Sequence, residues 1–325
     1  MALSVALCIA TYRRPAQLAA LLDALARLDT ADAGGLVVAV VDNDAAASAR
    51  AIVDAARAAL PFPVVYDVEP ERNISLARNR SVRLALERGA EWLAFIDDDE
   101  VPRREWLAEL LRVQRATGAE VVTGPVIAHL PEETPRWLRG AFSRDRHLPD
   151  GTPVPIAETA NALVSRRVID EMELRPPEDR PAGRRPASRR DAGAPGIVSA
   201  VEGPFEPEFG LSGGGDTRFF LRARLGGARI VWAAGAVVEE DVPPSRVRLG
   251  WLLRRAYREG NASAFVERGV LPLARWVPRR VAAACAHFVL GLGLTPFAPV
   301  RGLRLMANAV GSLAGTLGIR YFEYR

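Results

Sequence analysis

Apolar segments of strand length alternate with helical patterns over the first 127 residues. Strands are expected at 3–10, 36–41, 64–68, 92–96 and 120–127, and helices at 15–28, 45–60, 75–88 and 103–117. The expected strands are almost continuously apolar, which is typical of parallel strands buried on both faces. We therefore predict an α/β fold with a mostly parallel central sheet flanked by helices.

Polar side chains follow four of these strands at the point where each strand ends. They are Thr11, Tyr12 and Arg13 after the first strand, Asp42, Asn43 and Asp44 after the second, Arg72 and Asn73 after the third, and Asp97 to Glu100 after the fourth. In parallel sheets, ligands bind at the carboxyl ends of the strands. The four clusters therefore predict one functional site at this edge of the sheet.

The most distinctive of these clusters is the run of four carboxylates from Asp97 to Glu100. Adjacent negative charges repel one another and raise a pKa unless a cation is present, and Mg²⁺ or Mn²⁺ accepts carboxylate oxygens together with substrate phosphates. The alternative is a solvated acidic turn that complements the dipole of the next helix. We favour the metal site, because the run ends a buried strand beside three other polar clusters.

A second candidate is Asp216, which follows three consecutive glycines at 213–215. Glycines permit a close backbone approach, and the carboxylate stands at the head of a predicted helix that ends near residue 225. The alternative role is a simple N-cap. We favour a functional role, since a cap does not require three preceding glycines. Short strands are expected beyond it at 229–232 and 236–238.

Composition excludes several classes of enzyme. All 43 basic residues are arginine, so a lysine nucleophile, a Schiff base and a lysine-containing phosphate loop are impossible. The two cysteines, Cys8 and Cys285, lack the spacing of a disulfide framework or a zinc site, and this fits a reducing, cytosolic setting. No basic region precedes the first apolar segment, so no signal peptide is expected. Residues 175–196 hold six arginines and five prolines and are predicted to form a mobile loop.

The basic charge is concentrated at the end of the chain. Residues 244–325 hold thirteen arginines and three glutamates, a net charge of +10, and the preceding residues carry −6. A helix is expected at 251–264, and the uncharged stretch 281–300 is long enough to span a bilayer. Its glycines and prolines argue against one straight helix, and helices on an anionic membrane surface are favoured over a span or a buried interface. Nucleic-acid binding is not expected, because the arginines lie among apolar segments.

Four sequence strings, taken in order, resemble the family 2 glycosyltransferases of GT-A fold. They are CIATYRRP at 8–15, VDND at 41–44, NISLARN at 73–79 and FIDDD at 95–99, and the Asp216 region follows them. The similarity covers residues 1 to about 260. It is greatest to bacterial exopolysaccharide enzymes of succinoglycan type, which add a sugar from a UDP-sugar to a lipid-linked oligosaccharide.

The resemblance implies a role for each candidate on the donor side. Thr11 and its neighbours Tyr12 and Arg13 would hold the nucleotide, and Asp42 would accept a hydrogen bond from uracil. Arg78 would lie near the base and diphosphate. The remaining donor contacts implied by the resemblance are Asp97, which would meet the ribose, Asp98, and Asn161, on a strand that lines the sugar pocket.

The metal and the base also follow from the resemblance. Asp99, with Asp97, would hold a Mg²⁺ or Mn²⁺ ion, and Asp216 would take the proton of the acceptor hydroxyl. Gly215 stands where the family has a glutamate. Many relatives have a histidine near 238–244, where this chain offers only carboxylates, so Glu240 or Glu239 is expected to replace it, with Glu240 as our choice.

The resemblance thus implies a catalytic domain at 1–245, with a nucleotide-binding half (1–127) and an acceptor half (128–245), and a membrane-associating helical region at 246–325. The expected activity is metal-dependent, inverting transfer from a UDP-hexose to a hydroxyl of a lipid-linked saccharide. The expected location is the cytoplasmic face of the inner membrane. One alternative is a degenerate member that acts as a nucleotide-binding or membrane scaffold. Another is a nucleotidyltransferase, which is disfavoured because the chain lacks a glycine-rich phosphate loop near the first strand and any lysine.

Overall fold

The main sheet has seven strands in the order β3-β2-β1-β4-β8-β6-β9. The computed structural model describes residues 3–142, 147–174, 203–270 and 272–322, so the predicted loop at 175–196 lies outside the described residues. The strands are β1 (Leu3–Thr11), β2 (Ala33–Asp42), β3 (Val64–Val68), β4 (Trp92–Ile96), β6 (Val121–Thr123), β8 (Asn161–Ser165) and β9 (Ile230–Trp232). Only β8 runs antiparallel to its neighbours within this sheet. The predicted fold class is confirmed.

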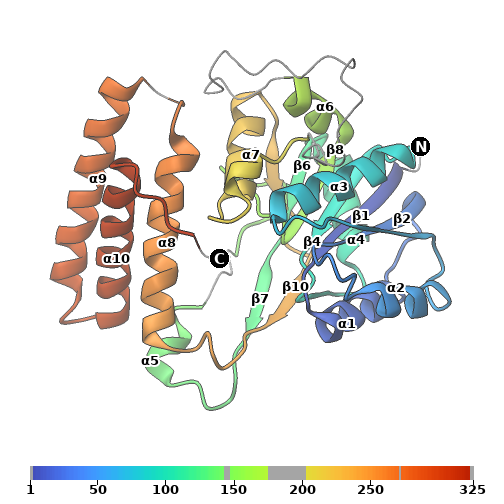
Figure 1. The fold of residues 1–325 in the computed structure, drawn as a ribbon, viewed down its shortest axis with the longest axis horizontal. Coiled ribbons are helices and arrows are strands. Elements are labelled where there is room, and N and C mark those ends of the chain that lie inside the picture. Colours follow the sequence, from blue (N-terminus) through green and yellow to red (C-terminus); the bar gives the residue numbers. More distant parts are fainter. Residues whose placement is uncertain (1–2, 143–146, 175–202, 271, 323–325) are drawn as a thin grey trace, which may run out of the picture.

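Helices cover both faces of this sheet (Figure 1). One face packs against α1 (Pro15–Leu25), α2 (Arg50–Arg57) and α4 (Trp106–Thr117), and the other against α3 (Ile74–Glu87), α6 (Arg166–Leu174) and α7 (Gly215–Leu225). Alternate residues of β1 enter the two cores: Val5, Leu7 and Ile9 join the first, and Ala6 and Cys8 the second. Helices bury both faces of the sheet, which explains why the strand sequences are continuously apolar.

A second, smaller sheet crosses the end of the first. It consists of β5 (Glu100–Pro102), β10 (Val238–Asp241) and β7 (Val126–His129), with β10 in the centre. The prediction of one strand over 120–127 is wrong, because Gly124 and Pro125 separate β6 from β7. A Cβ at Gly124 would lie 2.2 Å from the carbonyl oxygen of Ala236, so this bend requires glycine. The strand expected at 236–238 lies instead at β10, which aligns Glu240 opposite Glu100.

The loop after β2 replaces the first turn of a predicted helix. The helix expected from residue 45 begins only at Arg50, as α2. The carboxylate of Asp42 accepts hydrogen bonds from the backbone N–H groups of Asp44 and Ala49, and Asp44 accepts one from Ala46. These bonds offer the backbone an alternative to the helix, which is the usual effect of aspartate at a turn.

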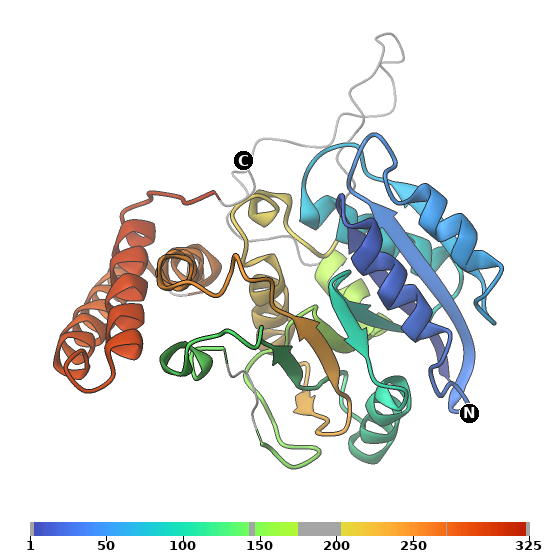
Figure 2. The ribbon, with the colours of Figure 1, turned by 90° about the horizontal axis from the view of Figure 1, so that it is seen from below.

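The last part of the chain forms a helical layer beside the sheets. Figures 1 and 2 show α10 (Pro299–Thr316) packed between α8 (Leu249–Glu267) and α9 (Leu273–Leu294). The uncharged stretch 281–300 is therefore divided between two helices, with a turn around Pro296. The described elements also include the short helices α5 (Arg136–Arg139) and η1 (Pro207–Phe209). The division of the chain at residue 245 stays a prediction.

Glycines bring the backbones of α8 and α10 into direct contact. A Cβ at Gly311 would lie 1.9 Å from the carbonyl oxygen of Tyr257, and one at Gly260 would lie 2.0 Å from that of Asn308. Real side chains do not tolerate such distances, so an added methyl group forces the two helices apart. Glycine here is required by packing rather than by backbone conformation.

We expect Gly311→Ala to lower the free energy of unfolding by about 1–3 kcal/mol, the usual cost of forcing an extra methyl group into a packed interior. Denaturant titration followed by far-UV circular dichroism would measure it. The matched control is Gly293→Ala on α9, where no atom beyond the neighbouring residues and the backbone of the same helix lies within 4 Å of the added Cβ. Equal stability of the two variants would contradict close packing of α8 on α10.

Candidate functional site

Three cavities adjoin one another from the strand ends to the helical layer. The strand-end cavity, of about 170 Å³, includes Thr11, Tyr12, Arg72 and Asn73. The central cavity, of about 460 Å³, includes Asp216, Glu240 and residues of α8. The helical-layer cavity, of about 660 Å³, lies between α5, α8 and the start of α10. The first two cavities share the wall formed by Arg14, Ile74, Arg78, Asp97 and Asp99.

The acidic run after β4 contributes Asp97 and Asp99 to this shared wall. Asp98 accepts hydrogen bonds from Thr11 Oγ1 (2.7 Å) and Arg14 Nη1 (2.9 Å), and burial raises its pKa to about 6. Asp99 lies 2.8 Å from Arg14 Nη1 and accepts a hydrogen bond from it. Asp97 forms an ion pair with Arg78 at 3.2 Å. Two arginines, Arg14 and Arg78, thus pair with three of the four carboxylates of the run.

Negative charge in the central cavity exceeds what these pairs neutralise. Burial and the neighbouring carboxylates Asp99 and Asp216 raise the pKa of Asp97. Glu100 is buried, and burial together with Asp97, Asp99 and Glu240 raises its pKa well above the ordinary value. Glu240 stands directly opposite Glu100 in the β5–β10 pair. Like charges in that position are destabilising without a cation.

The chemistry of these side chains fits a hard divalent cation, which prefers carboxylate oxygens. Among residues 3–142, 147–174, 203–270 and 272–322, however, no three acidic, histidine or cysteine side chains converge as a preformed metal site. Asp99 and Glu240 are instead held by Arg246, at 3.6 and 2.9 Å. Glu239 faces away and pairs with Arg103 and His129. Successive side chains of a strand point to opposite sides, so Glu240 lines the central cavity and Glu239 does not.

Asp216 lies in the first turn of α7 and lines the central cavity. The N-cap is Gly214, whose φ of +89° favours glycine, so Asp216 is not the cap. Its Oδ1 accepts the backbone N–H of Thr217 at 2.7 Å. A Cβ at Gly215 would lie 3.2 Å from Ser75 Oγ and 3.4 Å from Phe209 Cβ, so little room remains for the glutamate that the sequence resemblance implies at this position.

Arg218 ties α7 to the end of α8. Its Nη1 donates to the carbonyl oxygens of Val266 (2.8 Å) and Arg268 (3.1 Å), and its Nε forms an ion pair with Glu206 at 3.1 Å. The guanidinium is almost completely buried. The helix that carries Asp216 is thus anchored to the helical layer.

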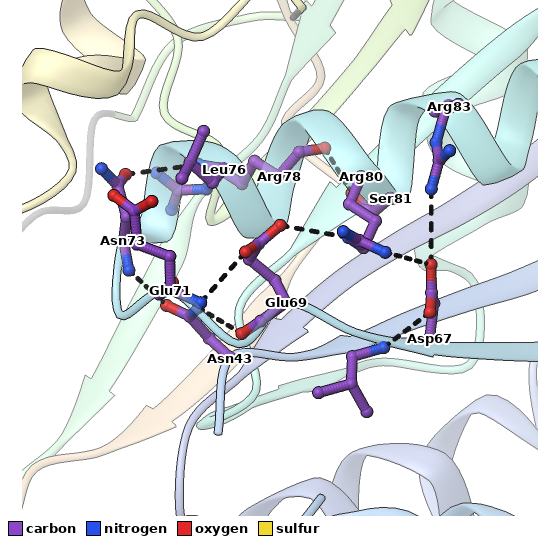
Figure 3. Close-up of polar contacts among 11 residues, drawn as sticks. Asn43, Asp67, Glu69, Glu71, Asn73, Leu76, Arg78, Arg80, Ser81 and Arg83 are labelled. Atoms are coloured by element: carbon purple, nitrogen blue, oxygen red, sulfur yellow. Dashed lines mark hydrogen bonds and ion pairs between the residues drawn. The ribbon is translucent and has the colours of Figure 1, made fainter. Parts of the chain in front are cut away.

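Two asparagines fix the loop between β3 and α3 (Figure 3). The side-chain amide of Asn43 donates to the carbonyl oxygens of Glu69 (3.0 Å) and Glu71 (2.6 Å), and its oxygen accepts the backbone N–H of Asn73. Asn73 then caps α3 by accepting two backbone N–H groups. This arrangement orients the first turns of α3 and places Arg78 against Asp97.

The predicted residues around Tyr12 divide between the cavity and the surface. Tyr12 lines the strand-end cavity, and the guanidinium of Arg72 lies 5.0 Å from its ring centroid. Arg13 is exposed and pairs with Asp44 at 3.0 Å, outside the three cavities. Thr11 lines the strand-end cavity and donates a hydrogen bond to Asp98. An aromatic ring beside arginine is a suitable surface for a nucleotide base.

Besides Arg13, two other predicted residues lie outside the cavities. Asp42 is fully buried, and besides the two backbone groups of its loop it accepts a hydrogen bond from Tyr66 Oη at 3.0 Å. Asn161 accepts from Trp106 Nε1 (2.8 Å) and donates to the carbonyl oxygens of Pro125 and Ala236. Both side chains stabilise loops at the sheet edge, and their roles toward a donor stay predictions.

Several residues of the central cavity were not identified from sequence. They are Arg14, Glu158, Arg246, Trp251, Arg255 and Arg258. Arg14 lies within the first motif and was visible there as a cation beside the strand end. The others come from loops and from α8, and no spacing in the sequence relates them to β4.

Residues 6–173 match the family model described as Glycosyl transferase family 2. The chain belongs to this family. It is 36% identical over 254 residues to the succinoglycan biosynthesis protein ExoM of Rhizobium meliloti (strain 1021), a match that covers 78% of this chain and 72% of that protein. The predicted resemblance to succinoglycan-type enzymes is confirmed, and the chain is a glycosyltransferase by family.

Solved glycosyltransferases share the fold. The mannosyltransferase PcManGT from Pyrobaculum calidifontis, in complex with GDP-Man and Mn²⁺, gives a TM-score of 0.55 at 18% identity, covering 98% of this chain and 88% of that one. TarS of S. aureus gives 0.52 at 13% identity, covering 95% of this chain, which spans 55% of the TarS chain. At these identities the likeness shows the GT-A architecture alone.

Proposed function

We propose that this family member transfers a sugar from a UDP-sugar to a hydroxyl of a lipid-linked saccharide, with inversion and with the help of a divalent cation. The observation that carries the proposal is that Asp216, Asp97 and Asp99 line one cavity at the carboxyl edge of the sheet. Sugar transfer needs a base for the acceptor and positive charge for the leaving diphosphate, and this cavity offers groups for both.

The donor would occupy the strand-end cavity and its shared wall. Tyr12 offers a ring for the base, and the guanidinium groups of Arg14 and Arg78 suit phosphate oxygens, which they can bind in pairs. Among proteins of this fold, TarS 1–349 is described in complex with UDP-GlcNAc and PcManGT with GDP-Man. A nucleoside diphosphate sugar is therefore the expected class of donor, and UDP is our choice from the sequence resemblance.

Asp216 would act as general base. Its carboxylate accepts the proton of the acceptor hydroxyl while that oxygen attacks the anomeric carbon. The bond from this carbon to the diphosphate oxygen breaks, and the electron pair leaves with the diphosphate. Attack from the face opposite the nucleotide inverts the configuration. Arg14 and Arg78 lie on the wall toward which the diphosphate would leave.

Asp99 would hold the cation, with Asp97 and Glu240 as the other oxygen donors. When bound, the ion supplies Lewis-acid stabilisation of negative charge on the diphosphate. Arg14 and Arg246 pair with Asp99, and Arg246 also pairs with Glu240. Arg78 pairs with Asp97, so the ion would displace arginine contacts at all three carboxylates. Released guanidinium groups remain beside the diphosphate and complement its charge.

The helical layer would attach the enzyme to an anionic membrane surface. Most residues of α9 from Val281 to Leu292 are exposed, although this segment carries no charge. Among the described helices, α9 alone is long and apolar enough to cross a bilayer by length and composition, with a mean hydropathy of 1.2. Because α9 packs along α10, surface attachment is our choice over a span. A lipid-linked acceptor then shares one surface with the enzyme.

Cys285 of α9 allows a direct test of attachment. It is exposed, whereas Cys8 is buried and burial raises the pKa of its thiol to about 12, so a thiol-reactive dye labels Cys285 selectively. We expect the emission of a polarity-sensitive dye at Cys285 to shift to the blue when phosphatidylglycerol vesicles are added. Phosphatidylcholine vesicles serve as the uncharged control. An unchanged spectrum with both would contradict attachment through α9.

The transfer itself is tested by measuring UDP released from UDP-hexoses with Mn²⁺ and a lipid-linked saccharide. Acceptor-dependent release supports the proposal. Binding of UDP without any release across the common UDP-hexoses would favour the scaffold alternative instead.

A further inference from the structure

The helical-layer cavity is a built site that the proposed reaction does not use. Its wall combines apolar residues of the α9–α10 turn with two arginines of α10, Arg301 and Arg304. Its volume of about 660 Å³ lies within the range of small-molecule sites. Two large side chains at its rim, Trp137 and Phe297, are 57% and 87% exposed. Together with Ala298, Pro299 and Val300 of the same lining, these rings form an apolar surface suited to an apolar partner.

The charge of this cavity selects an anion. Arg304 donates one N–H group to the carbonyl oxygen of Ala141 at 2.8 Å, which fixes its side chain and leaves further donors for a ligand. Arg301 is exposed and makes no hydrogen bond or ion pair within the described residues. The one acidic lining residue, Glu259, already pairs with Arg255 at 2.8 Å. Two arginines one helical turn apart suit the oxygens of a phosphate group.

The cavity also adjoins the reaction site. Glu259 lines both the helical-layer cavity and the central cavity, in which Asp216 lies. On the other side, Phe297 belongs to the turn that continues the exposed apolar surface of α9. The cavity is thus placed between a hydroxyl-activating carboxylate and an apolar surface.

We propose that the helical-layer cavity binds the phosphate-bearing end of the acceptor's lipid carrier. Arg301 and Arg304 contact the phosphate, Trp137 and Phe297 pack on the first part of the hydrocarbon chain, and the saccharide extends past Glu259 toward Asp216. This inference rests on the proposed function for the identity of the acceptor. It goes further in assigning the carrier its own site, separate from the bilayer contact of α9.

Farnesyl phosphate is a soluble probe for this site. We expect it to bind the full chain in calorimetry with the strand-end cavity saturated by UDP and Mn²⁺. Farnesol lacks the phosphate and is expected to bind at least about tenfold more weakly, which corresponds to one lost charge-assisted contact. Inorganic phosphate lacks the chain and is also expected to bind at least about tenfold more weakly, because it buries no apolar surface. Equal binding of farnesol would overturn the assignment of the arginines.

Variants locate the probe. Arg301→Gln alone, and with Arg304→Gln, should weaken farnesyl phosphate binding at least about tenfold and about a hundredfold, respectively. Arg279→Gln is the matched control, because Arg279 is an exposed arginine of α9 outside the cavities. If Arg279→Gln weakens binding as much as Arg301→Gln, the lower affinity results from the general loss of positive charge, and the proposed site is wrong. The single variant keeps the test valid if the double variant unfolds.

Vesicles distinguish the carrier from ordinary anionic lipid. The Arg301→Gln variant should lose binding to phosphatidylcholine vesicles that contain polyprenyl phosphate. The variant and the wild-type protein should bind phosphatidylglycerol vesicles equally well. If Arg301→Gln reduces binding to phosphatidylglycerol vesicles by the same factor, the arginines contact the bilayer surface and the proposal is overturned. UDP binding is measured on the same samples, and its absence contradicts the proposed function. The farnesyl phosphate result still decides whether the helical-layer cavity binds the phosphate of the carrier.

Discussion

Asp216→Asn is expected to lower turnover by about 10²- to 10⁴-fold, the usual contribution of a positioned general base. The amide cannot accept the acceptor proton, but its oxygen can still accept the backbone N–H of Thr217, so α7 should keep its first turn. Donor binding should change little, because Asp216 does not line the strand-end cavity. UDP release in the presence of acceptor measures turnover, and calorimetry with UDP measures donor binding.

Asp241→Asn provides a control for the loss of one carboxylate. Asp241 is exposed at the end of β10 and lines none of the three cavities. It should retain full turnover. Wild-type turnover in Asp216→Asn would exclude Asp216 as the base.

Asp99→Asn should weaken Mn²⁺-dependent UDP binding by more than about 100-fold. Removal of groups that merely orient a metal ligand costs 10- to 100-fold, and a direct ligand is expected to cost more. Without the Asp99 charge, the ion keeps only Asp97 and Glu240 as carboxylate donors in the proposed set. Calorimetric titration of UDP with Mn²⁺, and again after chelation with EDTA, gives the metal-dependent part of the affinity.

The neighbouring glutamates of β10 make this experiment more specific. Glu240→Gln should also reduce the Mn²⁺-dependent affinity, whereas Glu239→Gln should not, because Glu239 pairs with Arg103 and His129 outside the central cavity. If UDP binds Asp99→Asn as tightly as the wild-type protein, Asp99 is not a ligand. UDP affinity that does not respond to EDTA in any variant would show that the arginines alone hold the diphosphate.

The nucleotide side of the fold was predictable because its information is local. The apolar runs at 3–10, 64–68 and 92–96 needed only their composition to be recognised as buried strands, and the polar residues after them share one edge in any parallel sheet. Pro15 begins α1 as the sequence indicated, since a first-turn proline loses no helical hydrogen bond.

The acceptor side was less predictable because it depends on register and packing between distant segments. Glu100 faces Glu240 only through the antiparallel pairing of β5 with β10, which no local pattern specifies. Arg246 follows β10 and reaches Asp99 and Glu240 for the same reason. Asp42 shows the converse: its residue type suits a nucleotide contact, while its oxygens accept hydrogen bonds from the protein itself.

The anchoring of α7 by Arg218 has a mechanical consequence. The buried guanidinium holds the carbonyl oxygens of Val266 and Arg268, so a displacement of α8 also displaces the helix that carries Asp216. Because α10 packs tightly on α8, a force applied to the outer helices is transmitted to the base. Detergents or bilayers that engage α9 would accordingly alter proton transfer before they alter nucleotide recognition, which would show as a change in maximal rate at constant UDP affinity.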